Sequence, residues 1–141
     1  MRKLSLGVEM KNKMKGKKIE CMVIDDDRDD QEIFQLCVDR LEKDIYCTLC
    51  DNGVEALSYL SINENYIPGY IFLDVNMPKM NGIDCLKELR RIDRLNGTII
   101  FMYSTTSESS TLAEALKSGA KDFIIKPAKT ADLVKRLSSI F

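Results

Sequence analysis

Histidine is missing from this 141-residue sequence, and so are low-complexity tracts and apolar stretches long enough to span a membrane. The lack of histidine removes the side chain that would complete a zinc site together with cysteine. The lack of a long apolar run argues against a membrane partner or a membrane-spanning segment. What remains is an ordinary globular balance, with 45% hydrophobic and 30% charged residues, in a chain whose length suits one compact domain.

The cysteines carry no clear chemistry. There are five of them, and Cys47 and Cys50 form a C-x-x-C pair of the kind that can bind metal or undergo redox reactions. We expect segment 46–51 to be a strand, in which residues three apart point to opposite faces of the sheet. Cys47 and Cys50 would then not share a ligand. We expect reduced cysteines that pack in the core.

Charge divides the chain into two parts. Residues 1–18 hold seven Lys/Arg and one Glu, a net charge of +6, whereas residues 19–141 hold 14 Lys/Arg and 21 Asp/Glu, a net charge of −7. The basic segment lacks the apolar stretch of a secretory signal, so we expect a cytoplasmic protein. Such a segment could bind nucleic acid or an anionic membrane, but we expect residues 1–18 to be a disordered extension of one domain at 19–141.

Short apolar runs alternate with amphipathic segments from residue 19 onward, which predicts βα units and a parallel sheet. Strands are expected at about 21–24, 45–49, 70–73, 98–103 and 123–125. Asp29 and Glu32 resemble a capping box at the start of the first helix, Val54 and Leu60 are expected on the apolar stripe of the second, and Gly119 is expected to stop the fourth. The predicted fold is a (βα)5 doubly wound, flavodoxin-like α/β sheet of order 2-1-3-4-5.

The ends of the predicted strands carry the chemistry. In an open α/β sheet the binding crevice lies outside the carboxyl ends of the strands, where this sequence places Asp25, Asp26, Asp74, Ser104 and Lys126. Crowded carboxylates repel one another unless a cation or a proton relieves them, and oxygen ligands suit a hard cation. We therefore expect a Mg²⁺ site, with Mn²⁺ as a possible substitute. A nucleotide or FMN phosphate site is disfavoured by the acidic run.

Four segments in order identify a resemblance: V-I-D-D-D-R-D-D, I-F-L-D-V-N-M-P-K-M-N-G, Y-S-T-T and I-I-K-P. Together they resemble the response-regulator receiver domain of two-component signalling, of the stand-alone chemotaxis-regulator type, over residues 19–141. Each segment alone is weak evidence, but their order and their places at strand ends are specific. The L-D-x-N-M-P-x-x-N-G segment is the most specific of the four.

The resemblance implies a role for each matching residue. Asp74 would be the phosphoacceptor; Asp26, Asp74 and the backbone carbonyl of Asn76 would ligate the metal, and Asp25 would act through water. Lys126 would contact the phosphoryl group as a point charge. Ser104 would donate a hydrogen bond to that group, although the family more often has threonine there.

The family also implies a switch. Movement of the Ser104 hydroxyl would be linked to the strand-five aromatic, Phe123, and would change the surface formed by helix four, strand five and helix five. That surface is the expected contact for a downstream protein. Because the Lys126–Pro127 bond is often cis in this family, we expect the cis isomer.

Together these features predict a single-domain response regulator that takes a phosphoryl group from a sensor histidine kinase or a histidine phosphotransfer protein. It would not be an enzyme beyond its own phosphorylation and dephosphorylation, and it would signal through protein contact or phosphorelay, with no direct nucleic-acid binding. Two alternatives stay open. One is an aspartate-based phosphohydrolase of the haloacid dehalogenase type, for which Arg28 and the Lys-Pro loop fit badly; the other is a receiver-like binding module that is not phosphorylated.

Overall fold

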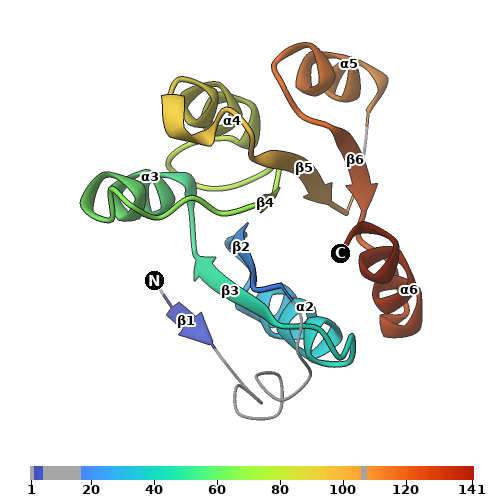
Figure 1. Cartoon of the computed structure of the whole chain (residues 1–141). Coiled ribbons are helices and arrows are strands. Elements are labelled where there is room, and N and C mark those ends of the chain that lie inside the picture. Colours follow the sequence, from blue (N-terminus) through green and yellow to red (C-terminus); the bar gives the residue numbers. More distant parts are fainter. Residues whose placement is uncertain (1, 5–16, 106–107) are drawn as a thin grey trace.

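The described part of the chain is organised around one six-stranded sheet (Figure 1). The computed structural model describes residues 2–4, 17–105 and 108–141. The strands are β1 (Arg2–Leu4), β2 (Ile19–Ile24), β3 (Ile45–Cys50), β4 (Tyr70–Leu73), β5 (Ile99–Ser104) and β6 (Asp122–Ile125), in the spatial order β1-β3-β2-β4-β5-β6. The five strands from β2 to β6 pair in parallel. Their order is the predicted 2-1-3-4-5, so the fold class is confirmed.

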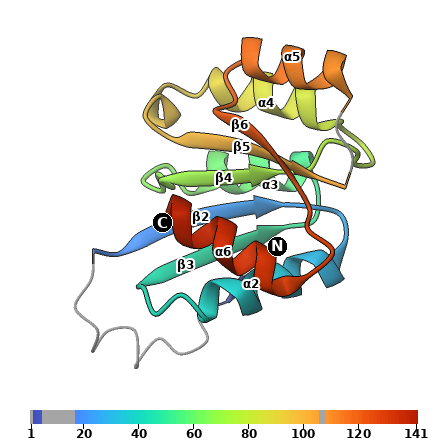
Figure 2. The ribbon, with the colours of Figure 1, turned by 90° about the vertical axis from the view of Figure 1, so that its right-hand side faces the viewer.

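Helices cover both faces of the sheet. They are α2 (Arg28–Asp39), α3 (Gly53–Ile62), α4 (Gly82–Arg90), α5 (Ser109–Lys117) and α6 (Thr130–Ile140), with a short 3-10 helix η1 (Asp93–Leu95). Figures 1 and 2 show α2 and α6 together on one face and α3 and α4 on the other. No helix in the described ranges combines the length and the apolar character needed to cross a membrane.

Each face of the sheet has its own hydrophobic core. Phe34 and Cys37 of α2 pack with Leu133 and Leu137 of α6 against one face, whereas Leu60 of α3 and the inner residues of α4 and α5 pack against the other. Central strand β4 is buried at Ile71, Phe72 and Leu73, as expected when helices cover both faces. Because the five strands are parallel, their carboxyl ends lie along one edge of the sheet, next to the loops that carry the polar residues.

Strand β1 was not foreseen. Arg2–Leu4 pair antiparallel with β3, with Arg2 opposite Leu49 and Leu4 opposite Cys47. Most of the segment that we expected to be disordered, namely residues 1 and 5–16, lies outside the described part of the chain. The sequence signal for β1 is weak because three residues are too few to show an alternating pattern.

Two details of the helices correct the expectations. Helix α2 begins before the predicted capping box: Asp27 is the N-cap, and its carboxylate accepts hydrogen bonds from the backbone N–H groups of Asp29 and Asp30. An extended backbone at Asp27 allows this, so Asp29 already lies in the first turn. In α3, Val54 is 46% exposed, because the buried side of this helix is formed by Gly53, Ala56 and Leu60.

The cysteine expectation is confirmed. All five cysteines are buried and none of them forms a disulfide bond, and Cys47 and Cys50 belong to the cores on opposite faces of the sheet. The Sγ atoms of Cys21 and Cys47, neighbours on β2 and β3, lie 3.2 Å apart. Burial raises the pKa of the Cys50 thiol to about 12, which favours the unreactive protonated form.

Candidate functional site

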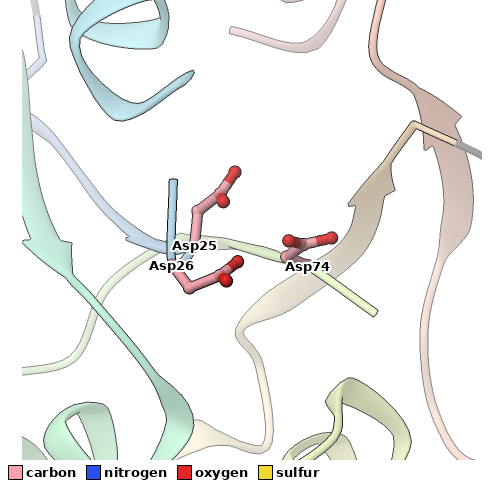
Figure 3. A group of neighbouring side chains, drawn as sticks. All are labelled: Asp25, Asp26 and Asp74. Atoms are coloured by element: carbon pink, nitrogen blue, oxygen red, sulfur yellow. The ribbon is translucent and has the colours of Figure 1, made fainter. Parts of the chain in front are cut away.

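Three carboxylates meet where two neighbouring strands end. Asp25 and Asp26 directly follow β2, and Asp74 directly follows β4. One oxygen of each carboxylate lies within 4.8 Å of one oxygen of each of the other two. Figure 3 shows the three side chains around a common space. Asp25 and Asp74 are buried, whereas Asp26 is exposed, so the cluster opens to solvent at Asp26.

The backbone fixes the two buried carboxylates. Oδ1 of Asp25 accepts a hydrogen bond of 3.0 Å from the N–H of Asp27, and Oδ1 of Asp74 accepts one of 2.8 Å from the N–H of Val75. The fully buried Gln31 side chain donates to the backbone oxygen of Asp25 at 2.6 Å. The loop that carries the acidic run is therefore held in place by hydrogen bonds from within α2 and from its own backbone.

Lys126, directly after β6, brings a positive charge to the carboxylates. Its Nζ lies 2.7 Å from Asp25, 2.9 Å from Asp30 and 3.7 Å from Asp74. The same nitrogen lies 5.3 Å from the centre of the Tyr103 ring, which is within the range of a cation–π contact. Only 9% of the lysine side chain is exposed, so this ammonium group is largely removed from water and depends on its partners.

Ser104 approaches Asp74 from β5. Its hydroxyl hydrogen-bonds the Asp74 carboxylate, and the residue is 1% exposed. Phe123 on β6 is half-buried and packs against the core on the side of α3, α4 and α5. Met102 is paired with Phe123 and Ser104 with Ile125, so Ser104 and Phe123 are diagonal neighbours on one face of the sheet.

Asn76 lies two residues after Asp74 in the loop between β4 and α4, and it is exposed. It lines the same surface hollow as Val75, Asn81 and Lys87. Its proposed metal contact would be made by the backbone carbonyl. The loop places this residue beside the cluster, and the contact itself stays a prediction.

The electrostatics of the cluster follow from burial. Burial raises the pKa of Asp25 to about 7, against the opposing effect of the hydrogen bonds from Lys126 and from the N–H of Asp27. Burial likewise raises the pKa of Asp74, although Lys126 and the Ser104 hydroxyl favour its charged form. For Lys126, burial alone would lower the pKa, but the bonds to Asp25 and Asp30 raise it. One ammonium group therefore does not fully offset the buried negative charge.

This donor set fits a hard divalent cation. Carboxylate oxygens are the ligands that Mg²⁺ and Mn²⁺ prefer, and a bound cation would favour the charged forms of Asp25 and Asp74, against the burial that raises the pKa of each. Among the described residues this is the group of carboxylates close enough to hold one ion. The predicted set of Asp25, Asp26 and Asp74 is thus brought together in space.

Three contributors escaped the sequence analysis. Asp30 and Tyr103 contact Lys126, and Gly82 lies against the backbone of Asp74. The sequence signals were present: Asp30 belongs to the same acidic run as Asp26, Tyr103 precedes Ser104, and Gly82 ends the N-M-P-K-M-N-G segment. The expected cis bond between Lys126 and Pro127 was wrong: the described residues contain no cis peptide bond. The trans form agrees with the general preference of X-Pro bonds.

Known proteins share this arrangement of sequence and fold. The family model described as the response regulator receiver domain matches residues 21–138. Chemotaxis protein CheY of Thermotoga maritima is 41% identical over 73 residues, which cover 52% of this chain and 59% of CheY. Response regulator SaeR of Staphylococcus aureus is 34% identical over 113 residues, or 79% of this chain and 47% of SaeR. The matches therefore span about half the length of these relatives.

A solved structure agrees with the sequence matches. The chain matched in the CheX–CheY–BeF3–Mg²⁺ complex of Borrelia burgdorferi has a TM-score of 0.73 and 25% identity, over 87% of this chain and 89% of that one. The four sequence segments, the strand order and the convergent Asp74 site all lie inside the matched region. Membership of a signalling family argues against the phosphohydrolase alternative. This chain belongs to the response regulator receiver domain family.

Proposed function

We propose that Asp74 accepts a phosphoryl group from a phosphohistidine protein in a reaction that needs a divalent cation. The observation that carries this proposal is the convergence of Asp25, Asp26 and Asp74 within 4.8 Å, with Lys126 3.7 Å from Asp74. An Asp74 carboxylate oxygen forms a bond to phosphorus while the phosphorus–nitrogen bond of the donor breaks. The imidazole leaves with the bonding electron pair and takes up a proton.

The other residues have distinct tasks in this transfer. A bound Mg²⁺ would offset the negative charge on the transferring phosphoryl oxygens. Asp25 and Asp26 would hold that ion together with Asp74 and the carbonyl of Asn76. Lys126 binds a phosphoryl oxygen, and Ser104 turns its hydroxyl from Asp74 to the new group. Hydrolysis reverses the state: water attacks phosphorus, the acyl oxygen–phosphorus bond breaks, and inorganic phosphate leaves.

Two comparisons support this assignment. The matched Borrelia complex contains a CheY with BeF3 and Mg²⁺, and a curated relative is the response regulator SaeR. We infer from them that the donor is a sensor histidine kinase or a histidine phosphotransfer protein. On the same basis the protein is a cytoplasmic signalling protein whose chemistry is limited to its own phosphorylation and dephosphorylation.

The proposed output surface is formed by α5, β6 and α6. Leu116 of α5 and Ile125 of β6 are each 46% exposed on these elements, so a protein partner that binds there would bury apolar surface. Ile125 is paired with Ser104 on the adjacent strand. Movement of the Ser104 hydroxyl would therefore directly affect Ile125, a residue of the proposed surface. Phe123 lies two residues before Ile125 on the same strand.

The test is intact mass spectrometry after incubation with acetyl phosphate, with and without Mg²⁺. Wild type should gain one phosphoryl group only with Mg²⁺, and hydroxylamine should replace it, as expected for an acyl phosphate. Asp74→Asn should gain nothing, whereas Asp132→Asn, the same change at an exposed position on α6, should behave as wild type. A folded wild type that binds Mg²⁺ and gains no mass would instead support the non-phosphorylated binding module.

A further inference from the structure

Lys126 contacts three carboxylates, although its proposed role in the reaction involves only the phosphoryl group on Asp74. An ammonium group has three protons to donate, and here Asp25 and Asp30 lie at hydrogen-bonding distance, 2.7 and 2.9 Å away. Asp74, whose phosphoryl group the lysine is to bind, lies farther away at 3.7 Å. The lysine is therefore engaged mainly on the α2 side of the site before any phosphoryl group arrives.

Asp30 differs from the other partners because it lies outside the metal-binding cluster. The candidate metal ligands are Asp25, Asp26 and Asp74, whereas Asp30 lies in the first turn of α2. Its backbone N–H donates to the Asp27 cap at 3.2 Å, which fixes the base of its side chain. Its carboxylate accepts the Lys126 hydrogen bond at 2.9 Å. If a metal ion bound Asp25, Asp30 would remain as a carboxylate partner of Lys126.

We propose that Asp30 is a positioning residue that holds Lys126 in a resting place and thereby slows phosphoryl transfer to Asp74 and weakens the phosphorylated state. This inference rests on the proposed function. Asp30 competes with a phosphoryl oxygen on Asp74 for the position of the Lys126 ammonium group, which lies 2.9 Å from Asp30 and 3.7 Å from Asp74, so the free energy of the Lys126–Asp30 bond opposes phosphorylation. The ring of Tyr103 faces the same Nζ, and this cation–π contact also stabilises the resting position of Lys126.

The decisive variant is Asp30→Asn, which keeps the shape of the side chain and removes its charge. At saturating Mg²⁺, this variant should be phosphorylated by acetyl phosphate roughly three- to tenfold faster than wild type, the range expected when a hydrogen bond to a charged group is weakened. Its affinity for beryllium fluoride with Mg²⁺ should rise by a similar factor. Mg²⁺ affinity is measured separately for each variant so that the comparison is made at equal saturation.

Two further variants separate the lysine contact from the loss of charge. Asp29→Asn removes the same charge from the same helical turn, at an exposed residue, and should match wild type. Asp30→Glu keeps the charge and should restore the slow rate. An Asp30→Asn protein that is no faster than wild type, or an Asp29→Asn protein that is equally accelerated, would overturn the proposal.

NMR spectroscopy of the wild-type protein tests the same contact and does not depend on whether a variant folds. With Mg²⁺ present, beryllium fluoride should shift the ¹⁵N resonance of the Lys126 ammonium and the ¹³C resonance of the Asp30 carboxylate together. An unchanged Asp30 resonance would overturn the proposal. Failure of wild type to gain a phosphoryl group would instead refute the proposed function, while the Lys126–Asp30 contact can still be read from the metal-free spectrum.

Discussion

Gly82 lies so close to the backbone of Asp74 that a Cβ atom at position 82 would be 2.2 Å from the Asp74 carbonyl oxygen and 2.7 Å from Cα of Val75. The N–H of Gly82 also donates to the carbonyl of Val75 at 2.7 Å. The loop after β4 thus folds back against the residue that carries the proposed chemistry. The glycine is needed for this close approach.

Gly82→Ala should therefore destabilise the protein by about 1–3 kcal/mol, the usual cost of forcing extra atoms into a packed region. It should also slow phosphorylation of Asp74, because the backbone on either side of the carboxylate must move. Urea unfolding and mass gain from acetyl phosphate measure the two effects. Gly97→Ala is the control, since a Cβ there meets no atom within 4 Å; equal losses in both variants would contradict the steric explanation.

The raised pKa of Asp25 predicts how stability depends on pH in the absence of metal. A folded-state pKa of about 7 against an ordinary value of 3.8 means that the folded protein binds the proton more tightly than the unfolded chain. The stability from this group is complete below pH 3.8 and is lost as pH rises through 7. Between about pH 5 and pH 8, wild type should lose roughly 2 kcal/mol more than Asp25→Asn.

Urea unfolding in the presence of a chelator measures this difference. Asp132→Asn should keep the wild-type slope, since Asp132 is exposed on α6 and distant in sequence from the cluster. Saturating Mg²⁺ should oppose the loss, because the ion binds the deprotonated carboxylates and stabilises the folded state by mass action. Identical pH profiles for wild type and Asp25→Asn would show that Asp25 titrates normally.

Removal of the Lys126 charge should have opposite effects on metal binding and on phosphorylation. In Lys126→Met the carboxylates lose their competing cation, so Mg²⁺ should bind roughly tenfold more tightly, given the strength of charge interactions at about 4 Å. Phosphorylation should be slower despite the tighter binding, because a phosphoryl oxygen loses its partner. Isothermal titration calorimetry and mass gain measure the two quantities. Lys129→Met, at an exposed position, should change neither, and weaker Mg²⁺ binding in Lys126→Met would contradict this account.

Arg90 should be a major contributor to stability. Its guanidinium group donates to the backbone carbonyls of Leu95, Thr98 and Gly119 at 2.9–3.1 Å, which joins the end of α4 to the starts of β5 and β6. Arg90→Ala should cost about 2–3 kcal/mol by leaving those carbonyls without a charged donor. The neighbour Arg91, exposed and paired with Glu88, should cost less than about 1 kcal/mol when changed to alanine. Urea unfolding of both variants is the measurement.

The strands and the main site residues were predictable because their signals are local. The run Tyr70–Leu73 is continuously apolar, so its end could be placed at Asp74, and the same reasoning placed Lys126 and Ser104. Parallel strands then bring those ends to one edge without any knowledge of loops. The helix stop at Gly119 was also predicted, and its φ of +111° explains why glycine ends α5 there.

The remainder depended on contacts that no local pattern encodes. The pairing of Lys126 with Asp30 joins residues that are 96 positions apart, and the direction of a flexible lysine is set by its surroundings. Asp27 and Asp29 are chemically identical, so only the backbone angles at Asp27 decide which of them caps α2. Arg90 lies in the last turn of α4, and no local pattern shows that its guanidinium group binds the carbonyls of later segments.

Ser104 and Lys126 reach Asp74 from opposite faces of the sheet. Ser104 lies two residues after Met102 and therefore on the face of the sheet whose core lies under α3, α4 and α5. Lys126 lies two residues after Ile124 and therefore on the face whose core lies under α2 and α6. A phosphoryl group on Asp74 would therefore accept one hydrogen bond from each layer of the molecule, from Ser104 on one face and from Lys126 on the other. The two layers of the molecule therefore meet the same chemical event through separate hydrogen-bond donors, and the proposed phosphoryl group would be the point that joins them.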